Sequence, residues 1–200
     1  MPREEAFKKN FASLLKDALL SRTIGGPVEI WFQNEARVGQ KRGHAYVWAP
    51  IGARPLMVRD NRHGSAYLFG AICPDRAVGA AIIMPAVSAE AMSHHLKEIS
   101  TQVAPRGHAV VICDGAGWHQ TGGRLHVPDN ITLLPLPPYF LELNPMENVW
   151  HYLRENTLCS RVWDTYEDIV EACATARHFL INDPQRIRSI GTRDWACVNI

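Results

Sequence analysis

The sequence carries almost no net charge. Its 200 residues include 21 Lys and Arg against 20 Asp and Glu, a formal net charge of +1 with the nine His counted as neutral. Binding to nucleic acid depends mainly on neutralising phosphates with Lys and Arg, so the composition argues against a protein that binds nucleic acid over its whole surface. With 46% hydrophobic residues, the chain is also not a disordered, highly charged tail.

The sequence also lacks paired cysteines and long apolar runs. Its five cysteines are odd in number, widely spread and never in a C-x-x-C pair, so neither a disulfide framework nor a zinc knuckle is expected. The longest uncharged apolar run, residues 77–87, contains Pro85 and is too short to span a membrane. Charged residues stand where a signal peptide would be apolar. A reduced, cytoplasmic setting is therefore expected.

The chain is long enough for one domain with a full hydrophobic core. Alternating or continuous apolar segments bounded by Gly, Pro and Asp predict strands at 28–33, 45–48, 66–73, 78–84, 109–113 and 131–136. Apolar residues at helical spacing predict helices at 1–22, from Ser88 to Pro105, from Asn144, and from Asp164 to Asp183. This order predicts a mixed α/β sheet flanked by helices, with antiparallel strands first and parallel strands later.

Two helix starts carry specific capping patterns. Asn144 is expected as the N-cap of its helix, with Pro145 at the first helical position and Glu147 at the third. The last helix is expected to begin at Asp164 with Glu167 at the third position. We expect residues 1–26 to form an N-terminal helix and linker, and residues 27–200 to form a single core.

Polar side chains follow the ends of the predicted strands, where ligand sites of such sheets lie. Asn34 and Glu35 follow the first strand, Asp114 follows the buried strand, and Glu147 lies in the first turn of the capped helix. A carboxylate after five apolar residues is costly to bury unless it is paired or binds a metal. Plainer roles remain open: Asp114 suits a turn before Gly115, and Glu147 suits a capping box.

Three segments carry a resemblance to a known family. They read WFQNEAR at 31–37, ICDGAGWH at 112–119, and LLPLPPY at 133–139 leading into ELNPMENVW at 142–150. In order, they resemble the signature blocks of the IS630-type transposases, which are bacterial insertion-sequence relatives of the Tc1/mariner group. The resemblance covers residues 27–195, with 32 residues between Asp114 and Glu147. It implies a DDE catalytic core of ribonuclease H-like fold.

The resemblance also implies a chemistry, namely two-metal-ion cleavage and transfer of DNA strands at transposon ends. In the active family, three carboxylates hold two divalent ions, normally Mg²⁺ (or Mn²⁺). One ion activates the attacking water or 3′-hydroxyl, and the other stabilises the leaving oxygen. Carried over by position, the catalytic residues are Asn34, Asp114 and Glu147, of which Asp114 and Glu147 remain metal ligands.

Asn34 departs from the family, because active relatives have Asp at this position. An Asn side chain is neutral and cannot bridge two cations as a carboxylate can. Glu35 is the alternative ligand, but side chains alternate along a strand, so Glu35 starts on the opposite face if Asn34 faces the site with Phe32. The hypothesis is a transposase fold whose nuclease activity is severely weakened or absent. His119 is expected either to support the site near the scissile phosphate or to be a packing or surface residue.

Positive charge is concentrated between residues 36 and 65. Six basic residues there oppose the single acid Asp60: Arg37, Lys41, Arg42, Arg54, Arg59 and Arg62. The segment is either a solvated loop or a contact to the DNA backbone or a dimer-forming arm. The resemblance favours the second interpretation, because mariner-group relatives place an extended clamp between their first two core strands.

The resemblance further implies a helix-turn-helix region, which the single helix at 1–22 cannot supply. Expected partners are therefore double-stranded DNA at transposon ends and target, a second copy of the chain or a larger assembly, and a separately encoded helix-turn-helix half. A truncated copy of a transposase is the alternative to such a half. Two other functions stay open: a catalytically dead DNA-binding or dimerising remnant, and a ribonuclease H-like nuclease on other substrates.

Overall fold

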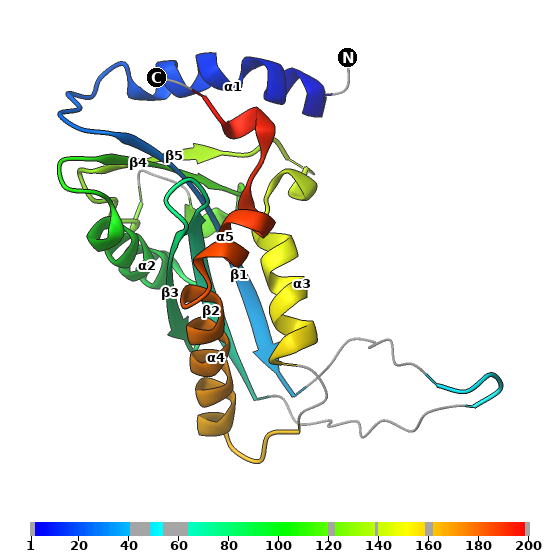
Figure 1. Ribbon diagram of the computed structural model, residues 1–200. Helices are drawn as coiled ribbons and strands as arrows, with labels where there is room; N and C mark the ends of the chain where they lie inside the picture. The colour runs from blue at the N-terminus through cyan, green and yellow to red at the C-terminus, as the bar shows by residue number, and fades with distance from the viewer. Residues whose placement is uncertain are drawn as a thin grey trace.

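Five strands form one mixed sheet in the computed structural model, which describes residues 3–40, 49–53, 64–119, 123–138, 140–158 and 162–198 (Figure 1). The strands are β1 (Val28–Gly39), β2 (Ser65–Cys73), β3 (Val78–Met84), β4 (His108–Cys113) and β5 (Ile131–Pro135), and their order is β3-β2-β1-β4-β5. β1, β2 and β3 pair antiparallel, whereas β4 and β5 run parallel to β1. The mixed sheet predicted from the sequence is therefore confirmed.

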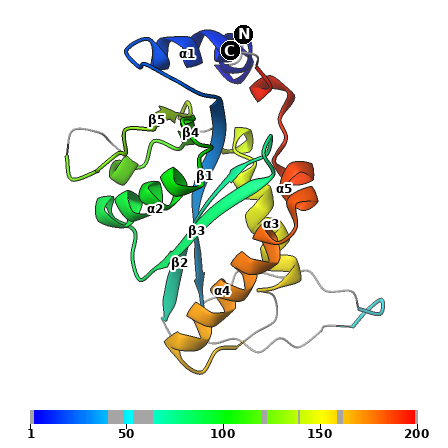
Figure 2. The same cartoon turned by 60° about the vertical axis from the view of Figure 1, so that its left-hand side comes forward.

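Helices cover both faces of this sheet. They are α1 (Arg3–Leu19), α2 (Ala89–Gln102), α3 (Met146–Asn156), α4 (Tyr166–Ile181) and α5 (Pro184–Gly191), with short 3₁₀ turns η1 (Gly117–His119), η2 (Leu141–Leu143) and η3 (Asp194–Ala196). α2 lies on one face, and α3, α4 and α5 lie on the other (Figures 1 and 2). α1 crosses one end of the molecule, where Phe7 and Phe11 pack edge-on against Trp195.

Alternation along β1 divides the core into two parts. Trp31 packs in the cluster beneath α2, and the next residue, Phe32, packs in the cluster beneath α3, α4 and α5. Every residue of β4 is buried, as expected for a parallel strand with helices over both faces. The predicted start of α2 is also confirmed, since the Ser88 hydroxyl accepts the N–H of Ala91.

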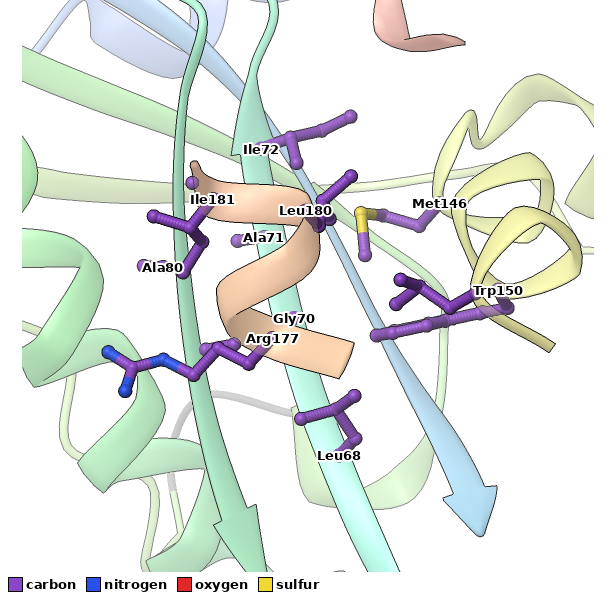
Figure 3. Close-up of a pocket in the computed structure, with 13 residues that line it drawn as sticks. Leu68, Gly70, Ala71, Ile72, Ala80, Met146, Trp150, Arg177, Leu180 and Ile181 are labelled. Carbon is purple, nitrogen blue, oxygen red and sulfur yellow. The ribbon is translucent and has the colours of Figure 1, made fainter. Parts of the chain in front are cut away.

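The close approach of α3 to β2 depends on a glycine. Met146 and Trp150 point from α3 into a narrow hollow of only about 10 Å³ between α3, α4, β2 and β3 (Figure 3). A Cβ added at Gly70 would lie 2.6 Å from Cη2 of Trp150 and 2.9 Å from Cε of Met146, so only glycine fits this contact. The Arg177 guanidinium points away, and the rest of the lining is apolar. We assign the hollow to packing.

The first strand is longer than predicted. β1 continues through Asn34 and Glu35 to Gly39, whereas the sequence analysis placed both side chains after the strand. The reason is pairing: β2 bonds to β1 from Phe32 to Gly39, and Asn34 faces Gly70 in this register. A partner strand thus keeps polar residues in extended structure. The strand predicted at 45–48 lies outside the described residues.

The last helices also differ from expectation. The helix predicted to start at Asp164 with Glu167 at its third position begins at Tyr166, because Thr165 is the cap and Asp168 closes the capping box. The Asp183 side chain caps α5, a helix that the sequence analysis did not predict. Asp-Pro ends one helix and starts the next, since Pro is well tolerated at a first helical position. In the described part of the chain, no helix combines the length and apolarity needed to cross a membrane.

Candidate functional site

The sheet register brings two of the three predicted catalytic positions together. β1 and β4 are adjacent and parallel, with Phe32 opposite Ile112. Two residues further along stand Asn34, still within β1, and Asp114, directly after the end of β4. Phe32 and Ile112, two positions before them, both pack in the core beneath α3. The site therefore lies where the parallel strand β4 ends.

Asn144 fixes the start of α3 against β1. Its buried side chain donates from Nδ2 to the carbonyl of Gln33 (2.8 Å), and its Oδ1 accepts the N–H of Met146 (3.1 Å). Asn144 was predicted as the N-cap with Pro145 inside the helix. The helix instead begins at Met146, with Pro145 at the cap position, although Asn144 still satisfies a terminal N–H. This arrangement places the first turn of α3 beside Asn34.

Glu147 contacts Asn34 directly. The Nδ2 of Asn34 donates to Oε1 of Glu147 at 2.7 Å, although the two residues are 113 positions apart in the sequence. The capping-box role considered for Glu147 is not what its geometry shows. The N–H of Asn144, which a capping-box Glu would accept, bonds to the carbonyl of Leu141. The side chain of Glu147 is turned toward the sheet.

His119 joins two carboxylates on the other side of the site. Its Nδ1 lies 2.8 Å from Oδ1 of Asp114, and its Nε2 lies 2.8 Å from Oε1 of Glu35. Only 3% of the His119 side chain is exposed. The turn role considered for Asp114 also holds, since its Oδ1 accepts the N–H of Ala116 at 3.0 Å. His119 is therefore not a surface residue, and its supporting role near the scissile phosphate stays a prediction.

The electrostatics of this group favour a charged histidine. Burial lowers the pKa of His119, but its hydrogen bonds, including those to Asp114 and Glu35, outweigh burial and raise the pKa to about 12. The hydrogen bond from His119 in turn lowers the pKa of Asp114 below its usual value. The imidazolium therefore acts as a fixed positive charge between two carboxylates.

Glu35 and Asn34 point to opposite sides of β1, as strand alternation predicts. Asn34 meets α3 through Glu147, whereas Glu35 accepts from Nε2 of Gln33 (3.0 Å) and meets His119 of η1, which packs near α2. Glu35 and Asp114 are joined through His119, at 2.8 Å from each carboxylate. Whether Glu35 replaces the first acid stays a prediction.

The two-ion centre that the resemblance implies does not fit these side chains. It requires three acids that offer oxygen atoms to the ions. Here the first position is an amide, and the group of Asn34 that faces Glu147 is an N–H donor, which repels a cation. Within the described residues, no three His, Cys, Asp or Glu side chains are grouped so as to hold a metal ion.

The predicted DNA-contacting residues are placed only in part. Arg37 lies in β1 with an exposed side chain. The other five, Lys41, Arg42, Arg54, Arg59 and Arg62, lie outside the described residues.

Gln33 was not predicted as a site residue, and Asn144 was predicted only as a cap. Gln33 provides the backbone carbonyl that anchors Asn144 and the side-chain amide that contacts Glu35. The available signal was the Asn-Pro pair before the helix, which indicated a cap and said nothing about its strand partner.

A buried histidine close to the site predicts acid sensitivity. His95 of α2 is fully buried beside Phe69, and burial lowers its pKa to about 3. Below pH 6.5 the unfolded chain binds a proton there that the folded chain does not, so stability falls as pH drops from 6.5 toward 3. We expect a loss of about 2 kcal/mol in unfolding free energy between pH 6.5 and 5, measured by urea titration.

The matched variants are His95→Gln and His94→Gln, which change a buried and an exposed histidine of the same helix. His95→Gln should reduce the pH-dependent loss by about 2 kcal/mol, and His94→Gln should leave it unchanged. An equal effect of both variants would contradict the assignment.

Known proteins resemble this chain in sequence and in fold. A family model described as DDE superfamily endonuclease matches residues 29–170. The uncharacterized protein y4pE/y4sA of Sinorhizobium fredii is 50% identical over 131 residues, which make up 66% of this chain and 96% of that protein.

Solved structures show the same fold. The Mos1 mariner paired-end complex with Mn superposes with a TM-score of 0.54 at 18% identity, covering 96% of this chain and 64% of that one. The Mos1 strand transfer complex gives a TM-score of 0.52 at 17% identity, covering 94% and 61%. The chain thus spans less than two thirds of the length of these solved chains. The predicted ribonuclease H-like fold is confirmed.

Proposed function

Because the chain belongs to the DDE superfamily endonucleases, we propose that it is the catalytic core of an IS630-type bacterial transposase whose DNA cleavage is strongly reduced by Asn34. One observation carries the proposal: the three sequence blocks meet in one site, where Asn34 contacts Glu147 and His119 joins Asp114 to Glu35. The same contacts support the assignment of Asn34, Asp114 and Glu147 as the three catalytic positions.

The role of metal ions differs between this chain and active relatives. In an active relative, two bound Mg²⁺ or Mn²⁺ ions would activate the nucleophile and stabilise the leaving oxygen. Two of the solved neighbours are described as Mos1 paired-end complexes with Mn and with Mg. Here the remaining candidate ligands are Asp114 and Glu147, and the change from Asp to Asn at the first position removes one charge that such a centre needs.

The proposed substrate is double-stranded DNA at the ends of the element that encodes the chain. The solved neighbours are described as paired-end and strand transfer complexes of Mos1, which supports this choice. DNA contacts are proposed through Arg37 and the basic residues of 41–62. The catalytic core is proposed to span residues 27–200, after an N-terminal helix and linker at 1–26. These cores are proposed to act as a homodimer or a larger assembly. A separately encoded helix-turn-helix half would supply end recognition. A bacterial cytoplasmic location, at the nucleoid when DNA is bound, follows from this substrate.

Asn34 also favours a second candidate function. A chain that keeps the fold and loses the first acid could act as a DNA-binding or dimerising remnant that competes with an intact transposase. Binding without cleavage, even after the first acid is restored, is the outcome that distinguishes this candidate.

A cleavage assay tests the proposed function. Duplex DNA carrying the terminal inverted repeats that flank the gene is incubated with Mg²⁺ or Mn²⁺ and with wild type, Asn34→Asp or Glu35→Ala. We expect Asn34→Asp to cleave DNA about 10- to 100-fold faster than wild type. Changes to the residues around metal ligands commonly reduce metal affinity or activity by that factor. Asn156→Asp, which adds the same charge at an exposed position of α3, is the matched control.

Robust cleavage by the wild type that disappears in Glu35→Ala would overturn the proposal and make Glu35 the first acid. Cleavage of RNA–DNA hybrids in place of transposon ends would favour a ribonuclease H-like nuclease.

A further inference from the structure

Both ends of the Asn34 side chain are engaged within the site. Its Oδ1 accepts the N–H of Glu35 at 2.9 Å, and its Nδ2 donates to Oε1 of Glu147 at 2.7 Å. Only 8% of the residue is exposed. These contacts fix the orientation of the amide, because a flipped amide would face its NH₂ group toward the N–H of Glu35 and its oxygen toward the carboxylate.

The positive end of the amide therefore occupies the side of Glu147 that faces β1. In a cation site, a metal ion supplies the positive charge that holds the carboxylate at this place. A hydrogen bond from an N–H to a carboxylate provides part of the same stabilisation without an ion. The contact also turns the only metal-binding atom of Asn34, Oδ1, away from Glu147 and toward the backbone of β1.

The other acids of the site are held in the same way. Oδ1 of Asp114 receives both Nδ1 of His119 and the N–H of Ala116. Glu35 receives Nε2 of His119 and Nε2 of Gln33. Each carboxylate of the site thus has a nitrogen partner supplied by the chain itself.

We propose that Asn34 substitutes for a cation: its amide locks Glu147 in place by a hydrogen bond, and the site is assembled without a divalent ion. The inference rests on the proposed function only in naming Asn34 as the first acidic position. The inference also extends that function. Asn34 in place of Asp then does more than remove a charge, because its side-chain N–H takes the place of the metal ion.

Thermal unfolding in EDTA and in saturating Mg²⁺ or Mn²⁺ tests this replacement. The wild type should keep the same midpoint in all three conditions. Asn34→Asp places two carboxylates in contact, so its midpoint should fall in EDTA and rise by about 5 °C or more when an ion binds between them. Asn156→Asp, which adds a carboxylate at an exposed position of α3, should show no response to metal.

A swapped pair provides the sharper variant. Asn34→Asp combined with Glu147→Gln exchanges the donor and the acceptor and can re-form the hydrogen bond with reversed direction. This double variant should recover the midpoint that Asn34→Asp loses in EDTA and should not respond to metal. If Asn34→Asp folds only with Mn²⁺ present, that dependence is itself the expected result.

Three outcomes would overturn the proposal: stabilisation of the wild type by several degrees in metal, an Asn34→Asp midpoint that ignores metal, or a swapped pair no more stable in EDTA than Asn34→Asp alone. None of these measurements involves DNA. A metal response of Asn34→Asp without any DNA cleavage would therefore count against the proposed function and leave this inference standing.

Discussion

Replacing His119 with alanine is expected to lower the free energy of unfolding by about 3–5 kcal/mol. The imidazole is almost completely buried and lies 2.8 Å from both Asp114 and Glu35. Its removal leaves the buried Glu35 carboxylate and the partly exposed Asp114 carboxylate without their shared positive partner. Removing one partner of a buried ion pair is strongly destabilising for this reason, whereas the intact pair contributes little net stability. Urea unfolding at pH 7 measures the loss.

The control for this variant is His151→Ala. His151 also pairs with a carboxylate, Glu155 at 3.1 Å, but 71% of its side chain is exposed. Exposed pairs contribute little, so this variant should change stability by less than about 0.5 kcal/mol. Similar small losses for both variants would show that His119 is not the buried bridge between the two carboxylates.

Replacing Asn144 with alanine is expected to cost about 2–4 kcal/mol. The variant removes the acceptor for the N–H of Met146, which is a capping loss, and leaves the buried carbonyl of Gln33 without its donor. Asn144→Asp keeps the cap but should be no more stable than Asn144→Ala, because a buried carboxylate oxygen would then face the carbonyl of Gln33. Urea unfolding separates the two effects, with the exposed Asn148→Ala as control.

Asn144→Ala should also weaken the contact between Asn34 and Glu147, because the Asn144 side chain anchors the first turn of α3 to β1. A stability loss below about 1 kcal/mol would show that α3 is held mainly by its apolar face and not by this anchor.

Local patterns predicted much of the fold. β3 has the predicted bounds, and the Ser88 cap lies where the sequence placed it. Both features depend on neighbours in the sequence. The length of β1 was wrong because it depends on β2, and α5 was missed because Asp183 and Pro184 suit the end of one helix as well as the start of the next.

The family resemblance predicted Asn34, Asp114 and Glu147 as the three catalytic positions. Alternation along the strand predicted that Asn34 and Glu35 point to opposite faces of the sheet. The contacts themselves were not predictable, because each joins residues far apart in the chain. Another example is the buried Glu29, whose carboxylate receives Arg76 at 3.0 Å and the N–H of Ala104 at 2.9 Å. Neither partner follows from sequence spacing.

The central claim is that Asn34 and Glu147 meet in one site in the folded chain, and a double-mutant cycle in urea unfolding tests it most directly. Asn34→Ala, Glu147→Ala and the double variant are compared with the wild type. A hydrogen bond to a charged group at 2.7 Å predicts a coupling of about 1.5–3 kcal/mol between the two positions. Losses that add within about 0.5 kcal/mol would contradict the contact, and with it the site described for this chain.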